Sequence, residues 1–68
     1  MKNTLRLERA KLKLTQEALA NKVNVSRQTI YAIETGKFLP SCQLALKIAT
    51  VCGQQVESIF LLESEDWE

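Results

Sequence analysis

Apolar residues recur along this chain at the spacing of helices, and no segment alternates apolar and polar residues as a half-buried strand does. Leu5 and Leu12 lie seven residues apart, whereas Val56, Ile59 and Phe60 repeat at i, i+3 and i+4. This pattern predicts an all-α fold of five short helices. We expect them at about residues 4–13, 16–23, 27–35 and 42–52, with a last short helix after Gln55.

Residues that favour helix ends separate these segments. Thr15, Ser26 and Ser41 each precede a helix-forming run, and their hydroxyl groups can accept a hydrogen bond from a free backbone N–H of the first turn. Gly36 and Gly53 follow two of the runs and suit the left-handed conformation that commonly ends a helix. The chain therefore divides into helices with short connections, without linkers or repeats.

Charge is distributed unevenly over the 68 residues. Residues 1–47 hold all nine Lys and Arg with three Glu, a net charge of +6, whereas residues 48–68 hold five acidic residues and no basic one, a net charge of −5. The overall charge of +1 hides this division. A basic body with an acidic end favours a polyanion such as nucleic acid as the partner.

Composition excludes several classes of site. The chain has no His and only two Cys, so it cannot form a four-ligand Cys/His zinc site, a Ser-His-Asp triad or a Cys-His pair. We therefore expect no metal, no cofactor and no enzymatic activity, and the sequence gives no sign of a small-molecule ligand. It has no apolar run of about 18 residues, and its first residues lack the apolar core of a signal peptide, so we expect a cytoplasmic protein without membrane contact.

Residues 16–33 have the spacing of a helix-turn-helix. Ala20 is small enough for two helices to cross closely, and Asn24 tolerates the left-handed backbone that the turn requires. Ile30 and Ile33 follow at positions expected to face the core. Successive helical residues lie about 100° apart. In the helix expected at residues 27–35, the face opposite Ile30 and Ile33 therefore points outward.

That outward face carries Arg27, Gln28, Tyr31, Ala32 and Thr35. In the major groove of DNA, Arg pairs with guanine O6 and N7, and Gln pairs with adenine N6 and N7. The N-terminal end of a recognition helix points most directly at the bases, so Arg27 and Gln28 are the expected base contacts. For Gln28 and Tyr31, an ordinary solvated face is the alternative.

Residues in and around this segment agree with one family pattern in their caps, turn and core spacings. They are Leu14, Thr15, Gln16, Glu17, Leu19, Ala20, Val25, Ser26, Arg27, Gln28, Thr29, Ile30, Ile33, Glu34, Gly36, Lys37, Pro40 and Ser41. The chain thereby resembles the phage repressor/Cro-type (Xre-like) helix-turn-helix family, in particular its short, single-domain members. The resemblance covers about residues 4–60.

The resemblance implies roles for individual positions. Gln16 is expected to bond a DNA phosphate and to brace Gln28. Arg9 and Glu34 are expected to form a structural ion pair. The residues expected to face the groove or the DNA backbone are Ser26, Arg27, Gln28 and Tyr31, with Thr29 at the groove edge and Lys37 on the backbone.

The chain also departs from the family pattern. Glu8 stands where the family has an apolar core residue, and we expect Leu7 or Leu12 to compensate for it. Ala32 removes a side chain that frequently contacts bases in the family, which narrows the set of base-contacting residues. Gln54 replaces an apolar turn residue.

Surplus apolar residues after the helix-turn-helix predict a dimer surface, formed by Val56, Ile59, Phe60, Leu61 and Leu62. The alternative is that the first three of these complete the core of a single chain. We assign residues 1–62 to a DNA-binding domain with a C-terminal dimerisation segment, which can include a short extended stretch, and residues 63–68 to an acidic tail. Trp67 either covers the partner subunit or lies in a disordered tail.

Together, these features lead to a functional hypothesis. The chain is expected to be a homodimeric, sequence-specific transcriptional repressor that binds a two-fold double-stranded DNA operator with its third helix in the major groove. One alternative is an antitoxin-type or other protein-binding module that also binds DNA. Another is a purely structural helical adaptor, which would show no salt-dependent DNA binding.

Overall fold

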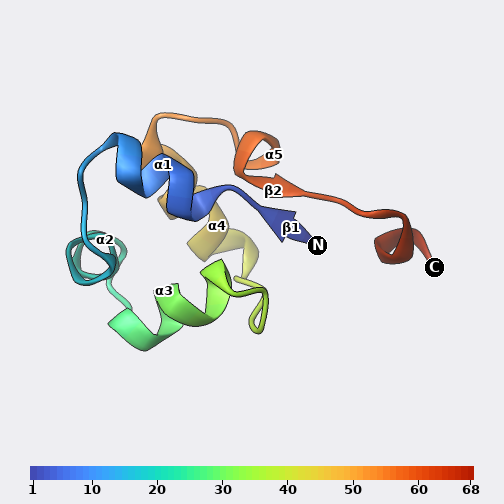
Figure 1. The fold of residues 1–68 in the computed structure, drawn as a ribbon, viewed down its shortest axis with the longest axis horizontal. Coiled ribbons are helices and arrows are strands. Elements are labelled where there is room, and N and C mark those ends of the chain that lie inside the picture. The colour runs from blue at the N-terminus through green and yellow to red at the C-terminus, as the bar shows by residue number, and fades with distance from the viewer.

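A computed structural model describes all 68 residues as a mostly helical domain (Figure 1). The expected all-α class with five helices is confirmed, and a two-stranded sheet and a terminal 3-10 helix are added to it. The helices are α1 (Leu5–Lys11), α2 (Gln16–Val23), α3 (Arg27–Glu34), α4 (Cys42–Cys52) and α5 (Val56–Ile59). The remaining elements are β1 (Lys2–Asn3), β2 (Phe60–Leu61) and the 3-10 helix η1 (Ser64–Trp67). No helix has the length and apolar character that crossing a bilayer requires.

The three expected N-caps begin their helices as the sequence indicates. The hydroxyl of Thr15 accepts the N–H three residues on at 3.0 Å, and those of Ser26 and Ser41 do the same at 3.2 Å. Each hydroxyl satisfies a donor that the helix leaves free in its first turn. These caps fix where α2, α3 and α4 start, and therefore how the helices are set relative to one another.

Four helices end in the same way, with a left-handed residue and two backbone hydrogen bonds that close the last turn. Asn24, Gly36 and Gly53 take this position after α2, α3 and α4, with φ angles of 61°, 79° and 66°. The fourth is Lys13, with φ 56°, after α1. Glycine adopts this conformation without strain, whereas a residue with a Cβ adopts it at a cost.

The first helix is shorter than the sequence pattern predicts. It ends at Lys11 rather than Lys13, because Lys13 turns left-handed and the N–H of Leu14 donates to the carbonyl of Arg9 at 3.1 Å. The third helix likewise ends at Glu34, one residue before the expected position. Both boundaries are set by the closing turn that leads into the next segment.

The two ends of the chain meet in an antiparallel pair of strands, in which Lys2 lies opposite Leu61 and Asn3 opposite Phe60. The N–H of Thr4 extends this contact by donating to the carbonyl of the last residue of α5 at 2.8 Å. The pattern at residues 2 and 3 predicts no strand. Phe60, which the spacing placed in the last helix, instead begins β2 and turns the chain into an extended segment.

The core lies between all five helices. Its fully enclosed side chains include Leu5, Leu19, Ile30, Ile48 and Ile59, one from each helix. Ala20 is also buried, on α2, which is the helix that packs most extensively against α3. The helix-turn-helix is therefore supported from behind by α1, α4 and α5.

The expectation that Leu7 or Leu12 compensates for Glu8 is wrong. Leu7 is 57% exposed and Leu12 is 43% exposed, while Glu8 itself is buried. The Lys11 ammonium lies 3.2 Å from the Glu8 carboxylate and neutralises it at the edge of the core. Burial raises the pKa of the neighbouring Cys52 thiol, and the Glu8 charge raises it further.

Candidate nucleic-acid interface

The third helix presents one apolar and one polar face. Ile30 and Ile33 are buried against the core, whereas Arg27, Gln28 and Tyr31 are exposed on the opposite side. The division follows the helical spacing predicted from the sequence. The outward groups are a guanidinium, an amide and a phenol, which can make hydrogen bonds to base edges and phosphates.

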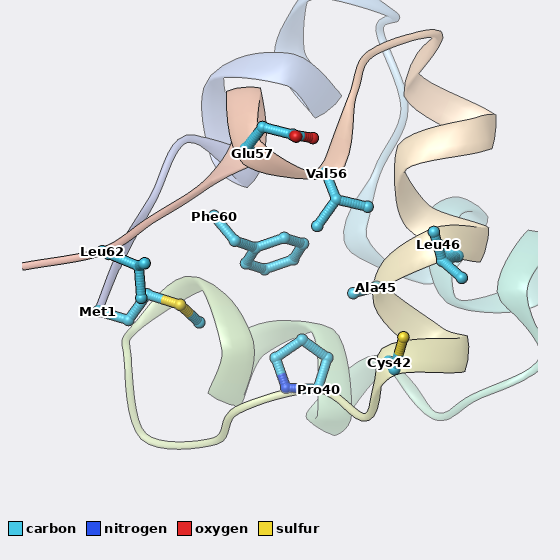
Figure 2. Close-up of a pocket in the computed structure, with 9 residues that line it drawn as sticks. All are labelled: Met1, Pro40, Cys42, Ala45, Leu46, Val56, Glu57, Phe60 and Leu62. Carbon is cyan, nitrogen blue, oxygen red and sulfur yellow. The ribbon is translucent and has the colours of Figure 1, made fainter. Parts of the chain in front are cut away.

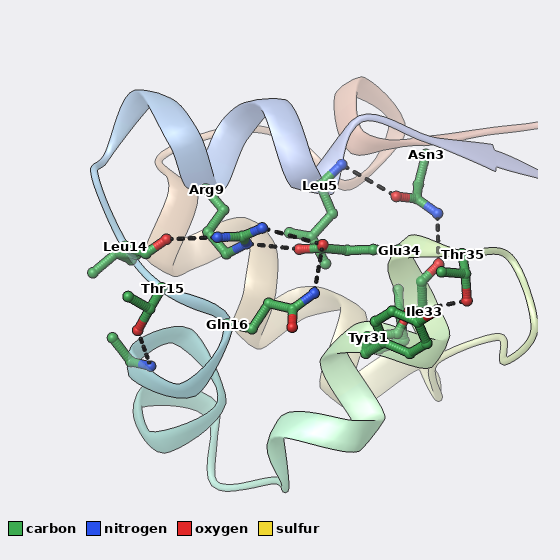
Figure 3. Close-up of polar contacts among 11 residues, drawn as sticks. Asn3, Leu5, Arg9, Leu14, Thr15, Gln16, Tyr31, Ile33, Glu34 and Thr35 are labelled. Carbon is green, nitrogen blue, oxygen red and sulfur yellow. Dashed lines mark hydrogen bonds and ion pairs between the residues drawn. The ribbon is translucent and has the colours of Figure 1, made fainter.

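An ion pair fixes the position of this helix (Figure 3). Arg9 of α1 donates from Nε to Oε2 of Glu34 at 2.8 Å and from Nη2 to Oε1 at 3.3 Å. Its Nη1 also donates to the carbonyl of Leu14 at 2.9 Å. The Glu34 side chain is only 5% exposed, so this two-pronged contact takes place largely away from water. It ties the end of α3 to α1 and to the turn before α2.

Gln16 joins the same cluster, because its Nε2 donates to Oε1 of Glu34 at 3.1 Å. Gln16 stands in the first turn of α2 and is half-buried. In the free chain its amide therefore links α2 to the ion pair. The contacts that the resemblance implies for Gln16, with a DNA phosphate and with Gln28, stay predictions for the DNA-bound protein.

Asn3 is a positioning residue that the sequence pattern did not indicate. Its Nδ2 donates to the carbonyl of Ile33 at 2.8 Å, and its Oδ1 accepts the N–H of Leu5 at 3.2 Å (Figure 3). One side chain thus gives the Ile33 carbonyl, which also accepts the N–H of Gly36 at 3.0 Å, a second donor, and it satisfies a free N–H at the start of α1. A lone Asn near the start of a chain carries no motif, so only the folded structure shows this contact.

A shallow hollow of about 370 Å³ lies between α1, α2 and α3 on this side of the molecule. It is lined by Arg6, Arg9, Gln16, Arg27, Tyr31, Glu34 and Thr35. Three guanidinium groups against one carboxylate make the hollow electropositive, which suits an anion such as a phosphate group. Arg6 lines the hollow but was not among the expected DNA-contacting residues. It lies three residues before Arg9 and therefore on the same side of α1, so the sequence spacing could have indicated it.

The remaining candidate DNA contacts lie at the two ends of α3. Ser26 and Thr29 face each other at its start, with their hydroxyl oxygens 3.0 Å apart. At the other end, Lys37 follows Gly36 and is exposed, and its N–H donates to the carbonyl of Ala32 at 2.9 Å. The exposed polar groups therefore extend along the full length of the helix.

The candidate dimer residues divide into two groups. Ile59 is fully buried and Phe60 nearly so, as in the alternative that they complete the core of one chain. Ile59 thus has no surface to offer a second copy. Val56 is half-buried, while Leu61 and Leu62 are 37% and 61% exposed. These three residues, with the edge of the Phe60 ring, are the apolar surface that remains available.

The fold and the polar face of α3 define a helix-turn-helix protein. A family model described as helix-turn-helix matches residues 5–59, and the chain belongs to this family. The resemblance found in the sequence is confirmed. The family is one of DNA-binding transcriptional regulators.

Similar proteins agree with this assignment. An uncharacterized HTH-type transcriptional regulator of Methanocaldococcus jannaschii is 54% identical over 97% of this chain and 100% of its own length. The HTH-type transcriptional regulator YgzD of Bacillus subtilis is 44% identical over 97% of this chain and 100% of its own. The crystal structure of a hypothetical transcription factor from Neisseria has a TM-score of 0.75 at 24% identity, covering 93% of this chain and 71% of that one, and it shows the fold alone.

Proposed function

We propose that the chain is a cytoplasmic, homodimeric repressor of transcription that binds a two-fold DNA operator, with α3 of each subunit in the major groove. The observation that carries this proposal is the exposed polar face of α3 beside an electropositive hollow. Buried residues hold one face of α3 against the core, and its opposite face is exposed. Binding in the major groove requires a helix placed in this way.

Direct base contacts fall to the first turn of α3. Arg27 donates two hydrogen bonds to a guanine, and Gln28 pairs with an adenine. Gln28 is exposed, so its amide can pair with a base. Tyr31 and Ser26 also face the groove, with Thr29 at its edge.

Contacts to the DNA backbone lie on either side of these base contacts. Gln16 and Arg6 lie beside the hollow, and Lys37 lies at the far end of α3. Phosphate contacts of this kind set affinity and orientation without choosing a sequence. They also make the binding sensitive to salt, because each neutralised phosphate releases counterions.

We infer dimerisation from the short length of α3, the helix that contacts the bases. One eight-residue helix contacts few base pairs, and two copies related by a two-fold axis double the site. Val56, Leu61 and Leu62 offer apolar surface on the C-terminal side, in the acidic segment that repels DNA. Bound across a promoter, such a dimer blocks access to the DNA and represses transcription.

Selection of bound sites from a random double-stranded DNA pool tests the proposal. We expect an inverted repeat whose half-site centres lie about 34 Å apart. Arg27→Ala is expected to weaken binding by about 1–3 kcal/mol and to relax the preference at one position of each half-site. Lys37→Ala serves as the matched control, because it should weaken binding equally on all sequences and lower the salt dependence by about one phosphate. An equal loss on all sequences for Arg27→Ala contradicts base contact.

A reporter gene tests the direction of regulation. With the selected operator placed over a promoter, the wild-type chain is expected to lower transcription, and the Arg27→Ala variant is expected to restore it. A rise in transcription with the wild-type chain would show an activator.

A further inference from the structure

An apolar pocket of about 420 Å³ lies on the C-terminal side of the molecule (Figure 2). It is lined by Met1, Pro40, Cys42, Ala45, Leu46, Val56, Glu57, Phe60 and Leu62. Most of these side chains are apolar, and Glu57 contributes the one carboxylate. Glu57 belongs to no ion pair in the chain, so its oxygens are free to accept a hydrogen bond.

Beyond this pocket the chain continues as an arm, residues 63–68, that leaves the body of the molecule (Figure 1). Its helical turn, η1, ends with Trp67, which is 77% exposed. This is the most exposed large apolar side chain of the protein and its only tryptophan. An indole left in water at the end of an arm lacks the cover that its apolar surface favours.

The arm has a fixed direction because the N-terminus holds it. The Met1 ammonium lies 3.1 Å from a carboxylate oxygen of Glu63 and 3.3 Å from one of Asp66. In addition, Asp66 accepts the N–H of Glu63 at 2.7 Å, which closes the first turn of η1. The segment held by these contacts extends outward from the body of the molecule (Figure 1). Trp67 does not line the pocket of its own chain.

We propose that Trp67 of each subunit fills the apolar pocket of the second copy, so that exchanged arms hold the dimer together. The proposal rests on the homodimer of the proposed function and names its central contact. In a two-fold dimer the same exchange occurs twice, because each copy offers both an arm and a pocket. Leu62 lines the pocket and also precedes the arm, so the two surfaces are continuous.

Size and chemistry match between the two parts. Extended residues and one 3-10 turn carry Trp67 about 13 Å beyond Leu62, far enough to cross a two-fold axis that passes near Leu62. A buried tryptophan also needs an acceptor for its indole N–H, and Glu57 on the pocket rim can supply it. A single carboxylate in an otherwise apolar pocket therefore suits an indole better than it suits an aliphatic side chain.

Fluorescence of Trp67 tests the exchange directly, since no other tryptophan contributes. A dilute wild-type chain is mixed with an excess of a Trp67→Phe chain, which is silent when tryptophan is excited but keeps its pocket. The expected result is a shift of Trp67 emission to shorter wavelength, with a several-fold loss of quenching by acrylamide, as the silent chain is added. Protection of Trp67 at dilutions where sedimentation shows monomers would mean that the arm covers its own pocket, which overturns the proposal.

Two silent chains provide the matched comparison. One carries Trp67→Phe with Leu46→Asp, which places a charge in the pocket, and the other carries Trp67→Phe with Leu12→Asp, a similarly exposed leucine outside it. The first is expected to lose the effect on emission and the second to keep it, with equal helical content by circular dichroism. Equal behaviour of the two chains counts against seating in this pocket.

Sedimentation separates the arm exchange from the homodimer itself. Trp67→Ala is expected to weaken self-association at least about 30-fold, as for a central interface tryptophan. A stable dimer whose Trp67 is as easily quenched as in the unfolded chain overturns the exchange and leaves the proposed function intact. A chain that stays monomeric both free and on its operator contradicts the homodimer, and the exchange with it.

Discussion

Two ends of the molecule differ in how far a single chain pairs or covers their side chains. At the α2–α3 end, the buried carboxylate of Glu34 has both Arg9 and Gln16 as partners, and the exposed side chains are polar. At the C-terminal end, Leu62 and Trp67 are largely exposed beside an apolar pocket. At the α2–α3 end, the buried polar groups are paired within one chain, and the exposed side chains can be solvated by water or contact DNA. The C-terminal end leaves apolar area uncovered, which is the property of a surface that meets another protein.

The same division appears in the charges. Residues 1–47 carry a net charge of +6 and residues 48–68 a net charge of −5. Phosphates repel an acidic segment, so in the proposed complex the C-terminal surface turns away from the double helix. In the proposed dimer, charge as well as position therefore separates the DNA-binding surface from the dimer surface.

The largest expected effect is a loss of stability at the α2–α3 end, where the buried carboxylate is paired within one chain. Arg9→Ala leaves the Glu34 carboxylate buried without its main partner, and the free energy of unfolding should fall by about 3 kcal/mol. Urea denaturation measures this loss. Lys22→Ala, at an exposed lysine without an ion pair, is the control and should change stability by less than about 0.5 kcal/mol. A loss below about 1 kcal/mol for Arg9→Ala would show that the ion pair does not hold this end together.

The next effect concerns the C-terminal end, whose apolar surface we propose to meet a second copy. Leu62→Glu places a charge on the proposed dimer surface and is expected to weaken self-association by about 2 kcal/mol, while the stability of the monomer is kept. Sedimentation at several concentrations measures the change. Leu7→Glu alters a leucine of similar exposure, 57% against 61%, on α1 outside this surface, and it should leave association unchanged. The same weakening in both variants argues against a specific surface.

A smaller effect sharpens the contrast between two similar caps. Ser26→Ala and Ser41→Ala each remove a hydroxyl that accepts an N–H at 3.2 Å, and each should destabilise the fold by about 1 kcal/mol. Only Ser26 stands at the start of α3, which we propose faces DNA. Once corrected for stability, DNA affinity measured by titration is therefore expected to fall for Ser26→Ala alone. A matching fall for Ser41→Ala would mean that affinity only follows stability.

The smallest effect concerns the arm and its dependence on pH. The pKa of the Met1 ammonium is raised, chiefly by its hydrogen bond with Glu63, so its contribution is full below the unfolded value of about 8 and is lost as the pH rises through the higher folded value. The pKa of Asp66 is lowered, chiefly by the N–H of Glu63, so its contribution is lost only in acid.

The arm should therefore loosen on the alkaline side before the fold does. In dilute, monomeric protein, the fluorescence anisotropy of Trp67 is expected to stay constant near neutral pH and to decrease above the pKa of Met1. Circular dichroism over the same range serves as the control, since the helices do not depend on this contact. Constant anisotropy far into the alkaline range would show that the N-terminus does not hold the arm.

The helix boundaries show what the sequence could predict. The bounds of α2 and α4 agree with the structure because a capping hydroxyl precedes each helix and Asn24 or Gly53 follows it. The end of α1 was missed because Lys13, which turns left-handed there, is not a residue type that indicates a turn. The left-handed residue that ends a helix can therefore be predicted from the sequence only where it is Gly or Asn.

Long-range contacts were the least predictable part of the fold and of the site. A strand of two residues shows no alternation, and the partner of β1 lies near the other end of the chain. The outward face of α3 followed from helical spacing alone. In contrast, the bond from Gln16 to Glu34 and the two bonds of Asn3 depend on where three helices meet, which no local pattern records.

The pairing of β1 with β2 also has a consequence for synthesis. Lys2 pairs with Leu61, so the strand pair can form only after Leu61 has been synthesised. At about 5–20 residues per second, translation from Lys2 to Leu61 takes roughly 3–12 s, whereas small helical domains fold in milliseconds or less. Synthesis of this segment, and not the folding step, therefore sets the time at which the strand pair forms. A product that stops before residue 59 lacks both Ile59 in the core and the second strand, and we expect it not to reach the stable fold.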